Sequence, residues 1–217
     1  TRTEAHRVIE EAMLAANVCA ADFITLAKHP LLYRVHEGPT PERKVLLQNY
    51  LKALGLGLSI SDEPRPAEYQ SIAAATRDRA DAQQIHTMLL RSMQQAIYTG
   101  INSGHFGLAF EAYAHFTSPI RRYPDLLVHR VIHALLGGKR YHLVPPATVV
   151  AKTLSRKGAR PVKHASPEAA LWESAGAHCS ANERRADEAS RDVEAWLKCR
   201  YMREHLGEEF GGTVSAI

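Results

Sequence analysis

Residues 105–130 read HFGLAFEAYAHFTSPIRRYPDLLVHR, and this stretch carries the features that decide the fold. Small, apolar and aromatic residues alternate over positions 105–116, a pattern typical of a half-buried strand. Positions 117–119 read TSP, which is turn and helix-start chemistry, because hydroxyls cap free amides and proline fits a first helical turn. Pro124 has no N–H to donate inside a helix, so the regular helix is predicted to begin near it.

Two adjacent arginines, Arg121 and Arg122, are therefore predicted to lie on a tight turn at the N-terminus of that helix. Free backbone amides, the positive end of a helix dipole and two guanidinium groups together favour phosphate binding. The alternative for paired arginines on a turn is a surface ion pair. We predict a phosphate site at this turn.

The composition is that of a globular protein with an uneven charge. The chain has 217 residues, of which 45% are hydrophobic, enough for one large domain or one and a half ordinary ones. The formal net charge is +4, but residues 126–167 contain no Asp or Glu and several Lys and Arg. Such a segment is either a solvated loop or a surface for a polyanion, and the sequence leaves both open.

The cysteines and the apolar stretches exclude several classes of protein. The three cysteines, Cys19, Cys179 and Cys199, lack metal-type spacing, and the first and last fall in apolar helical patterns. They are predicted to be buried free thiols in a reducing cytoplasm. No apolar run has the length of a membrane span, and no signal peptide is recognisable. The opening Thr1 and the closing FGGTVSAI suggest a piece of a longer protein.

Apolar periodicity and Pro or Gly boundaries predict a mostly helical chain. The helices are expected at about 4–28, 41–54, 67–77, 82–98 with Asp81 as N-cap, 124–136 closed by Gly137 and Gly138, and 167–206. The first is expected to bury a broad face, formed by Val8, Ile9, Ala12, Met13, Ala16, Cys19, Ala20, Phe23 and Leu26. The last is expected to bury a core stripe, formed by Ala186, Ala189, Val193, Trp196 and Leu197. Residues 139–166 are expected to form a basic connector.

Four motifs give the chain a family resemblance. They are HRVIEEAMLAANVCAA at 6–21, MLLRSMQQAIY at 88–98, YAHFTSPIRRYPDLLVHR at 113–130 and HCSANERRADEASRDVEAWLKC at 178–199. With these in view, the chain resembles the ribonuclease II/R family of processive 3′-to-5′ exoribonucleases, most of all its ribonuclease R branch. The resemblance implies an α+β fold. Residues 1–206 would be the mostly helical C-terminal part of an RNB-type catalytic domain with few strands, and residues 207–217 the first strand of an OB-fold RNA-binding domain.

The family hydrolyses single-stranded RNA to nucleoside 5′-monophosphates with Mg²⁺ held by closely spaced aspartates. The seven aspartates of this chain include no adjacent or alternate pair, and a two-metal site needs several convergent carboxylates. In the family that motif lies upstream of the segment matched by Thr1. We therefore expect the isolated chain to hold no metal ligands and to be inactive. The alternatives are an RNA-binding fragment without catalysis, and a purely structural helical domain that shows no salt-dependent RNA binding.

The resemblance also implies roles for individual residues. Arg121 would contact the scissile phosphate as the catalytic residue, and Arg122 would share phosphate binding or support the turn. One of Glu10 and Glu11 would bond the ribose of the 3′-terminal nucleotide, which tells RNA from DNA. The remaining RNA-binding candidates are Tyr123, His105, Arg184 and Arg185, the last two mainly as helix-surface pairs. Tyr113 is expected in the core rather than under a base.

Two further expectations concern the surroundings of the site and the partners of the protein. Gly107 would serve either a close backbone approach or packing. Single-stranded RNA is the expected partner, with ribosome-associated RNA-quality-control factors besides. The expected protein is a cytoplasmic monomer without a membrane partner.

Overall fold

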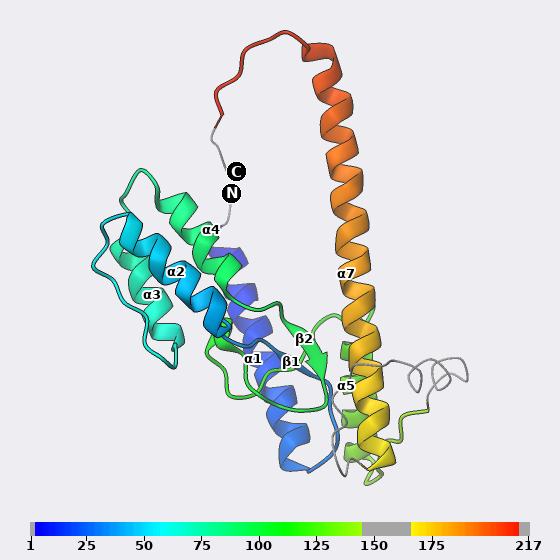
Figure 1. The fold of residues 1–217 in the computed structure, drawn as a ribbon. Coiled ribbons are helices and arrows are strands. Elements are labelled where there is room, and N and C mark those ends of the chain that lie inside the picture. The colour runs from blue at the N-terminus through cyan, green and yellow to red at the C-terminus, as the bar shows by residue number, and fades with distance from the viewer. Residues whose placement is uncertain (1–2, 145–165, 213–217) are drawn as a thin grey trace. The chain divides into compact units, whose positions relative to one another are not determined.

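The computed structural model describes residues 3–144 and 166–212, and the chain divides into two compact units, Thr1–Cys179 and Ser180–Ile217 (Figure 1). The described fold is mostly helical with one pair of short strands, which confirms the predicted α+β class. Its elements in chain order are α1 (Glu4–Leu26), β1 (Tyr33–Val35), α2 (Pro41–Ala53), α3 (Pro66–Ala75), α4 (Ala82–Ser92), β2 (Ile97–Thr99), the 3₁₀ turn η1 (Phe106–Leu108), α5 (Tyr123–Leu136), α7 (Pro167–Met202) and the 3₁₀ turn η2 (Arg203–His205).

The first unit holds two hydrophobic cores. One lies between α1, β1, α5 and the first turns of α7, with Ile24, Leu127 and Trp172 among its buried side chains. The other lies between α2, α3 and α4, which pack side by side around Leu51 and Ile85 (Figure 1). Burial of such apolar surface is the main favourable term in folding. Two separate cores hold the segments from α1 to α5 in place around the irregular stretch between β2 and α5.

The strand pair contributes to the first of these cores through β1. β1 and β2 pair antiparallel, with Tyr33 opposite Thr99 and Val35 opposite Ile97. Tyr33 and Val35 are buried, so the residues that alternate with them, Arg34 and the following His36, share the other face of β1. That face is only partly buried and carries two basic side chains.

Two secondary-structure predictions were wrong. Residues 105–116 do not form a strand: η1 and a short bridge between His105 and Phe110 occupy the first half. The His105 N–H donates to the Phe110 carbonyl at 2.8 Å, and this bond closes a tight loop, with Ala109 in the left-handed region at φ 56°. The helix predicted over 82–98 ends at Ser92, because residues 97–99 pair with β1 instead.

The predicted buried face of α1 was also wrong, although the helix itself is confirmed. Its buried residues are Asn17, Ala20, Ala21 and Ile24. Val8 and Ile9 are exposed, at 66% and 69%. The side chains packed against α1 come from α5 and β1, and they contact its C-terminal half. Tertiary packing, rather than the widest apolar stripe, therefore selects the buried face.

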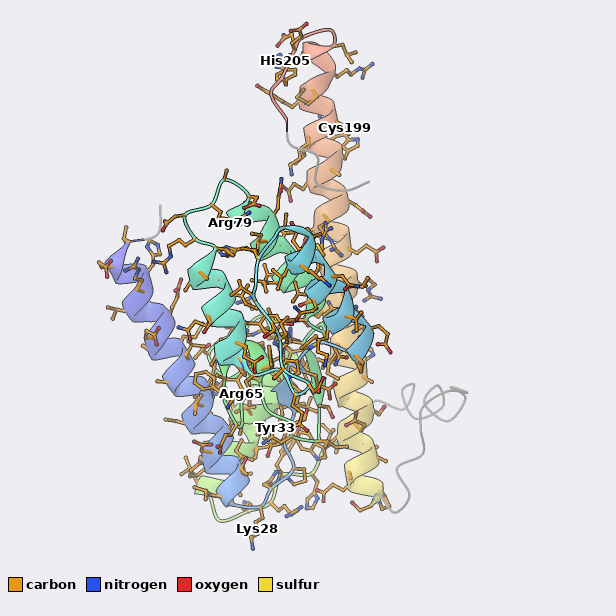
Figure 2. All side chains as sticks on the ribbon, turned by 60° about the vertical axis from the view of Figure 1, so that its left-hand side comes forward. Lys28, Tyr33, Arg65, Arg79, Cys199 and His205 are labelled. Atoms are coloured by element: carbon orange, nitrogen blue, oxygen red, sulfur yellow. The ribbon has the colours of Figure 1, made fainter. Side chains whose placement is uncertain are left out.

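The predicted core stripe on the last helix and two of the predicted buried thiols were wrong as well. Val193, Trp196 and Leu197 are all more than half exposed. They belong to the second unit, whose described part is a single helix followed by η2 and has no second layer to cover them. Cys19 and Cys199 are free but exposed, the latter on α7 (Figure 2).

The other helix boundaries were predicted to within two residues, except that α7 ends at Met202, four residues before its predicted end, and is followed by η2. α5 begins at Tyr123 and is capped by Gly137, and Gly138 adopts φ 66°. Asp81 occupies the N-cap of α4 but makes no capping bond, because its carboxylate pairs with Arg79 at 2.7 Å. Residues 145–165 of the basic connector and residues 213–217 of the predicted terminal strand lie outside the described residues, and residues 207–212 are not in a strand. Within the described ranges, no helix is both long enough and apolar enough to cross a membrane.

Candidate nucleic-acid interface

The turn before α5 has the geometry that its sequence predicts. The backbone N–H groups of Arg121 and Arg122 both donate to the Ser118 carbonyl, at 3.2 and 3.0 Å, and α5 starts at the next residue. Arg121 is exposed, and none of the ion pairs between described residues involves it. Its guanidinium group is thus presented beside a helix N-terminus, where an anion is favoured.

Arg122 has a different environment, because its guanidinium group is held by a buried carboxylate. Arg122 Nη2 donates to Asp125 Oδ1 at 2.7 Å, and the same oxygen accepts the Ser118 N–H at 2.8 Å. Asp125 is fully buried and the Arg122 side chain is only 20% exposed. Of the two interpretations of the paired arginines, a phosphate site or an ion pair, the ion pair therefore applies to Arg122 and not to Arg121. Asp125 was not predicted as a site residue, and its only signal in the sequence is its place three residues after Arg122, in the first turn of the helix.

Asn17 joins α1 to the start of the same turn. Its buried side chain donates from Nδ2 to the Tyr113 hydroxyl at 2.8 Å. Its Oδ1 accepts the backbone N–H groups of Phe116 at 2.9 Å and Thr117 at 3.2 Å. Tyr113 is a core residue, as predicted. A polar side chain inside an apolar helix stripe was the signal for Asn17, because a buried amide has to find partners.

Glu10 and Glu11 lie on different faces of α1. Glu10 precedes Asn17 by seven residues, or two helical turns, and therefore lies on the same face of α1 as the buried Asn17 and Ile24. Glu10 is partly buried, whereas Glu11 is exposed and lies about 100° further round the helix. The face of α1 that is bonded to the arginine turn is thus the face of Glu10.

A group of rings connects the arginine turn with the strand pair. The His115 ring bonds through Nδ1 to the Tyr98 hydroxyl at 2.8 Å and contacts the Tyr113 ring edge-on. The Arg34 guanidinium lies over the face of Tyr98, 4.6 Å from the ring centroid. His105 contacts Tyr113 on one side and His36 on the other, at centroid distances of 5.3 and 5.0 Å.

The two central histidines are held neutral. Burial, followed by the positive charges of Arg122 and Arg34, lowers the pKa of His115 to about 3. Burial and the neighbouring His36 and Arg34 lower the pKa of His105 to about 4. At neutral pH the positive charge of this region is therefore that of its arginines.

The depressed pKa of His115 predicts a pH-dependent stability. The unfolded chain binds a proton on this ring below about pH 6.5, and the folded chain does not until about pH 3, so stability falls as pH falls through this window. Between pH 6.5 and 4 the wild-type chain should lose on the order of 3 kcal/mol more unfolding free energy than His115→Asn, which keeps an acceptor for Tyr98 but cannot titrate. Urea denaturation at both pH values measures the difference. Equal losses of unfolding free energy in the wild-type chain and in His115→Asn would contradict the prediction.

The backbone of Gly107 packs closely against the His36 side chain. Its backbone N–H donates to His36 Nδ1 at 2.9 Å, and a Cβ at this position would lie 2.8 Å from the same nitrogen. Gly107→Ala should therefore push the His36 ring away and cost about 1–3 kcal/mol of stability. Amide hydrogen exchange should show faster exchange confined to residues near η1. Gly57→Ala is the matched control, because a Cβ there meets nothing within 4 Å.

The remaining predicted residues are more dispersed. Tyr123 is 48% exposed at the start of α5, and partial burial raises the pKa of its hydroxyl. His105 is partly buried at the N-cap of η1. Arg184 and Arg185 are exposed on α7 in the second unit.

Over residues 3–144 and 166–212, no group of three or more His, Cys, Asp or Glu side chains is placed to hold a metal ion. These residues do not fit a two-metal site of the kind that magnesium nucleases use.

Known proteins resemble this chain along its whole length. Residues 1–138 match the model of the RNB domain. Ribonuclease R of Escherichia coli is 46% identical over 216 residues, all of this chain and 25% of that protein. Ribonuclease R of Thermotoga maritima is 39% identical over 98% of this chain and 28% of its own length. The chain thus spans about a quarter of the length of these relatives.

Solved structures give the same fold. Mycoplasma genitalium RNase R in complex with ribose-methylated single-stranded RNA superposes with a TM-score of 0.80 at 24% identity, over all of this chain and 31% of that one. Yeast Ssd1, described as a pseudonuclease, superposes over 70% of this chain and 19% of its own with a TM-score of 0.58 at 23% identity. The same architecture therefore occurs in a nuclease and in a protein described as a pseudonuclease, so activity has to be argued from the site.

Proposed function

Because the chain belongs to the RNB-domain family, we propose that it supplies the phosphate-binding part of a processive 3′-to-5′ exoribonuclease. The substrate is single-stranded RNA and the products are nucleoside 5′-monophosphates. The observation that carries this proposal is Arg121, an exposed guanidinium group on a turn held by two buried polar side chains, Asp125 and Asn17. A rigid turn places the charge before the substrate arrives, which is the arrangement that stabilises a developing phosphoryl charge.

Each residue of the interface has a proposed role. Arg121 stabilises the charge on the scissile phosphate, and Arg122 supports the turn through Asp125. His105 and Tyr123 line the RNA path from opposite ends of the 105–123 segment. Arg184 and Arg185 add positive charge for the RNA backbone from the second unit. These assignments require RNA to pass the surface that carries Arg121.

The metal chemistry of the proposed reaction comes from outside the described residues. Mg²⁺, when bound, would neutralise phosphoryl charge and activate water. Its ligands are proposed to lie in other parts of the full-length protein, because the relatives are about four times as long as this chain. The full-length protein is proposed to be a cytoplasmic monomer that works with ribosome-associated RNA-quality-control factors.

The direct test uses the full-length protein, Mg²⁺ and a 5′-labelled single-stranded oligoribonucleotide. Steady shortening from the 3′ end with release of nucleoside 5′-monophosphates is expected. The present chain alone should leave the RNA intact, and degradation by it would contradict the placement of the metal ligands. The alternative is an RNA-binding protein without catalytic activity, and the observation behind it is the likeness to a protein described as a pseudonuclease. RNA binding by the full-length protein without any shortening would establish that alternative.

Glu10 is proposed as the ribose-binding glutamate, because it shares a face of α1 with Asn17. Its carboxylate would accept a hydrogen bond from the 2′-hydroxyl of the terminal nucleotide. A hydrogen bond to a charged group contributes about 1.5–3 kcal/mol, so Glu10→Gln should reduce the preference for a 3′-terminal ribonucleotide over its 2′-deoxy analogue by about 10-fold or more.

Glu11→Gln is the matched control for this prediction, since the two residues are adjacent and only their faces differ. The ratio of kcat/KM for oligonucleotides with ribose and deoxyribose ends measures the preference. A loss of preference in the Glu11 variant, with none in the Glu10 variant, would reverse the assignment.

A further inference from the structure

The most apolar face of α1 is exposed in this chain. At about 100° per residue, a single arc of about 100° contains only apolar residues along the whole helix. Its exposed members beyond the first turn are Val8, Ile9, Ala12, Cys19, Phe23 and Leu26. We call these six residues the outer face of α1. No charged or hydrogen-bonding amide or hydroxyl side chain interrupts it.

A different face of α1 holds the helix in its unit. Asn17 and Ile24 are buried there, about a third of a turn away from the outer face. Asn17 accepts the backbone N–H groups of the arginine turn, and Ile24 belongs to the first hydrophobic core. The outer face therefore contributes neither to that core nor to the support of the turn.

Two properties of α1 indicate that a further layer covers the outer face. Single exposed apolar residues are ordinary on a protein surface, whereas a continuous apolar strip marks an interaction surface. The side chains of α5 and β1 contact only the C-terminal half of α1. A helical segment of about 12 residues without tertiary contacts is only marginally stable in water, so the N-terminal half also needs a partner.

The charges beside the outer face restrict what that partner can be. Glu4, Glu11 and Asp22 are exposed along one edge of it. Arg7, the only Lys or Arg of α1, pairs with Glu4 at 2.9 Å. RNA phosphates and anionic lipid headgroups are disfavoured beside an acidic edge, because like charges repel. The partner is therefore a protein surface with an apolar side.

The rest of the same polypeptide is the protein surface that the comparisons favour. Ribonuclease R of Escherichia coli is about four times as long as this chain, and the chain corresponds to 31% of the Mycoplasma genitalium RNase R chain. Segments joined in one polypeptide meet at a high effective concentration, so an apolar strip on one of them is covered from within the molecule before a separate molecule can bind.

We propose that the outer face of α1 is an intramolecular interface, covered in the full-length protein by an apolar surface from outside these 217 residues. α1 is then a middle layer: one face supports the arginine turn, and the other carries the remainder of the protein. The inference goes beyond the proposed function, because it involves neither RNA nor a metal ion.

The thiol of Cys19 reports on this interface, because it is free and exposed in the present chain. Full-length protein is treated with N-ethylmaleimide in native buffer and in urea, and alkylation of the Cys19 peptide is followed by mass spectrometry. The ratio of the two rates largely removes the intrinsic reactivity of the thiol. Cys19 should react on the order of 100-fold more slowly in the native protein, because only local opening exposes it.

Asp22→Cys, made in Cys19→Ser protein, is the matched control. Position 22 is three residues further along α1, on the acidic edge, and should react within a few-fold of its rate in urea. Rapid labelling of Cys19 in the native protein would overturn the inference, because the outer face would then lie in water. Equal protection of both positions would also overturn it, because the cover would not be specific to the apolar face.

Two further measurements identify the cover. Protection of Cys19 should survive dilution of the protein by about 100-fold, whereas a second copy would dissociate, and loss of protection with a fall in mass by light scattering would overturn the intramolecular assignment. Phe23→Asp places a charge one turn from Cys19 and should raise its labelling rate about 10-fold or more, whereas Phe23→Leu should change it less than a few-fold. Unchanged protection in Phe23→Asp would show that the cover does not contact the outer face.

Discussion

Replacing Arg121 with alanine in the full-length protein is expected to lower kcat by about 10³-fold while RNA affinity changes by less than a few-fold. An arginine that stabilises phosphoryl charge in the transition state is worth about 10³–10⁵ in kcat in other phosphoryl-transfer enzymes. The exposed Arg121 side chain has no ion pair with a described residue, so its removal breaks none of those pairs. The turn itself should persist, because Asp125 and Asn17 hold it through backbone N–H groups and Arg122.

Single-turnover cleavage with Mg²⁺ measures the effect on catalysis, and RNA binding without Mg²⁺ measures the effect on affinity. Arg77→Ala is the control, since Arg77 is an exposed arginine that follows the C-cap of α3 and belongs neither to the turn nor to the contacts that hold it. Arg121→Lys should recover only part of the rate, because a lysine keeps the charge but not the planar fork. An affinity loss as large as the loss of turnover would make Arg121 a general binding residue rather than a transition-state residue.

The contrast between the two arginines shows what the sequence could not predict. Their turn and the start of α5 followed from local chemistry, since proline and hydroxyl residues restrict the backbone within a few positions. The partner of each guanidinium group did not follow from local chemistry, because it depends on which carboxylate is buried beneath the turn. Asn17, about 100 residues away in the sequence, completes the support. No local pattern encodes contacts of this kind.

The errors in secondary structure have a related cause. Alternation over residues 105–116 resembles a strand, yet a strand needs a neighbour, and the two halves of this segment bond to His36 and to Arg34 in different ways. Residues 97–99 continue a helical pattern but pair with β1, because a tertiary partner outweighs a weak local preference.

Arg122→Ala is expected to destabilise the chain by about 3 kcal/mol or more. Removal of one partner from a buried ion pair leaves an uncompensated charge, which typically costs about 3–5 kcal/mol. Here the remaining charge is the Asp125 carboxylate, which is fully buried and would keep the Ser118 N–H as its only donor among the described residues. For a chain of this length the melting temperature should fall by roughly 6–12 °C.

The double variant Arg122→Ala/Asp125→Asn separates the charge from the loss of contacts. The asparagine keeps an oxygen that accepts the Ser118 N–H but carries no charge, so it should regain a measurable part of the lost melting temperature. Asp81→Asn is the control, because Asp81 pairs with Arg79 at a partly exposed site, where ion pairs contribute little. A double variant no more stable than Arg122→Ala would show that the buried charge is not the cause.

The same variants decide what Arg122 does for RNA. If Arg122 acts through the turn, the double variant should bind RNA with an unchanged salt slope, although it cleaves more slowly because Arg121 is less firmly held. If its guanidinium group binds a phosphate directly, the slope should fall by about 0.7. The ion pair with Asp125 favours the first result, since it already occupies the group at 2.7 Å and holds it in a largely buried position. Arg121 then acts on the phosphate, and Arg122 fixes the backbone from which Arg121 acts.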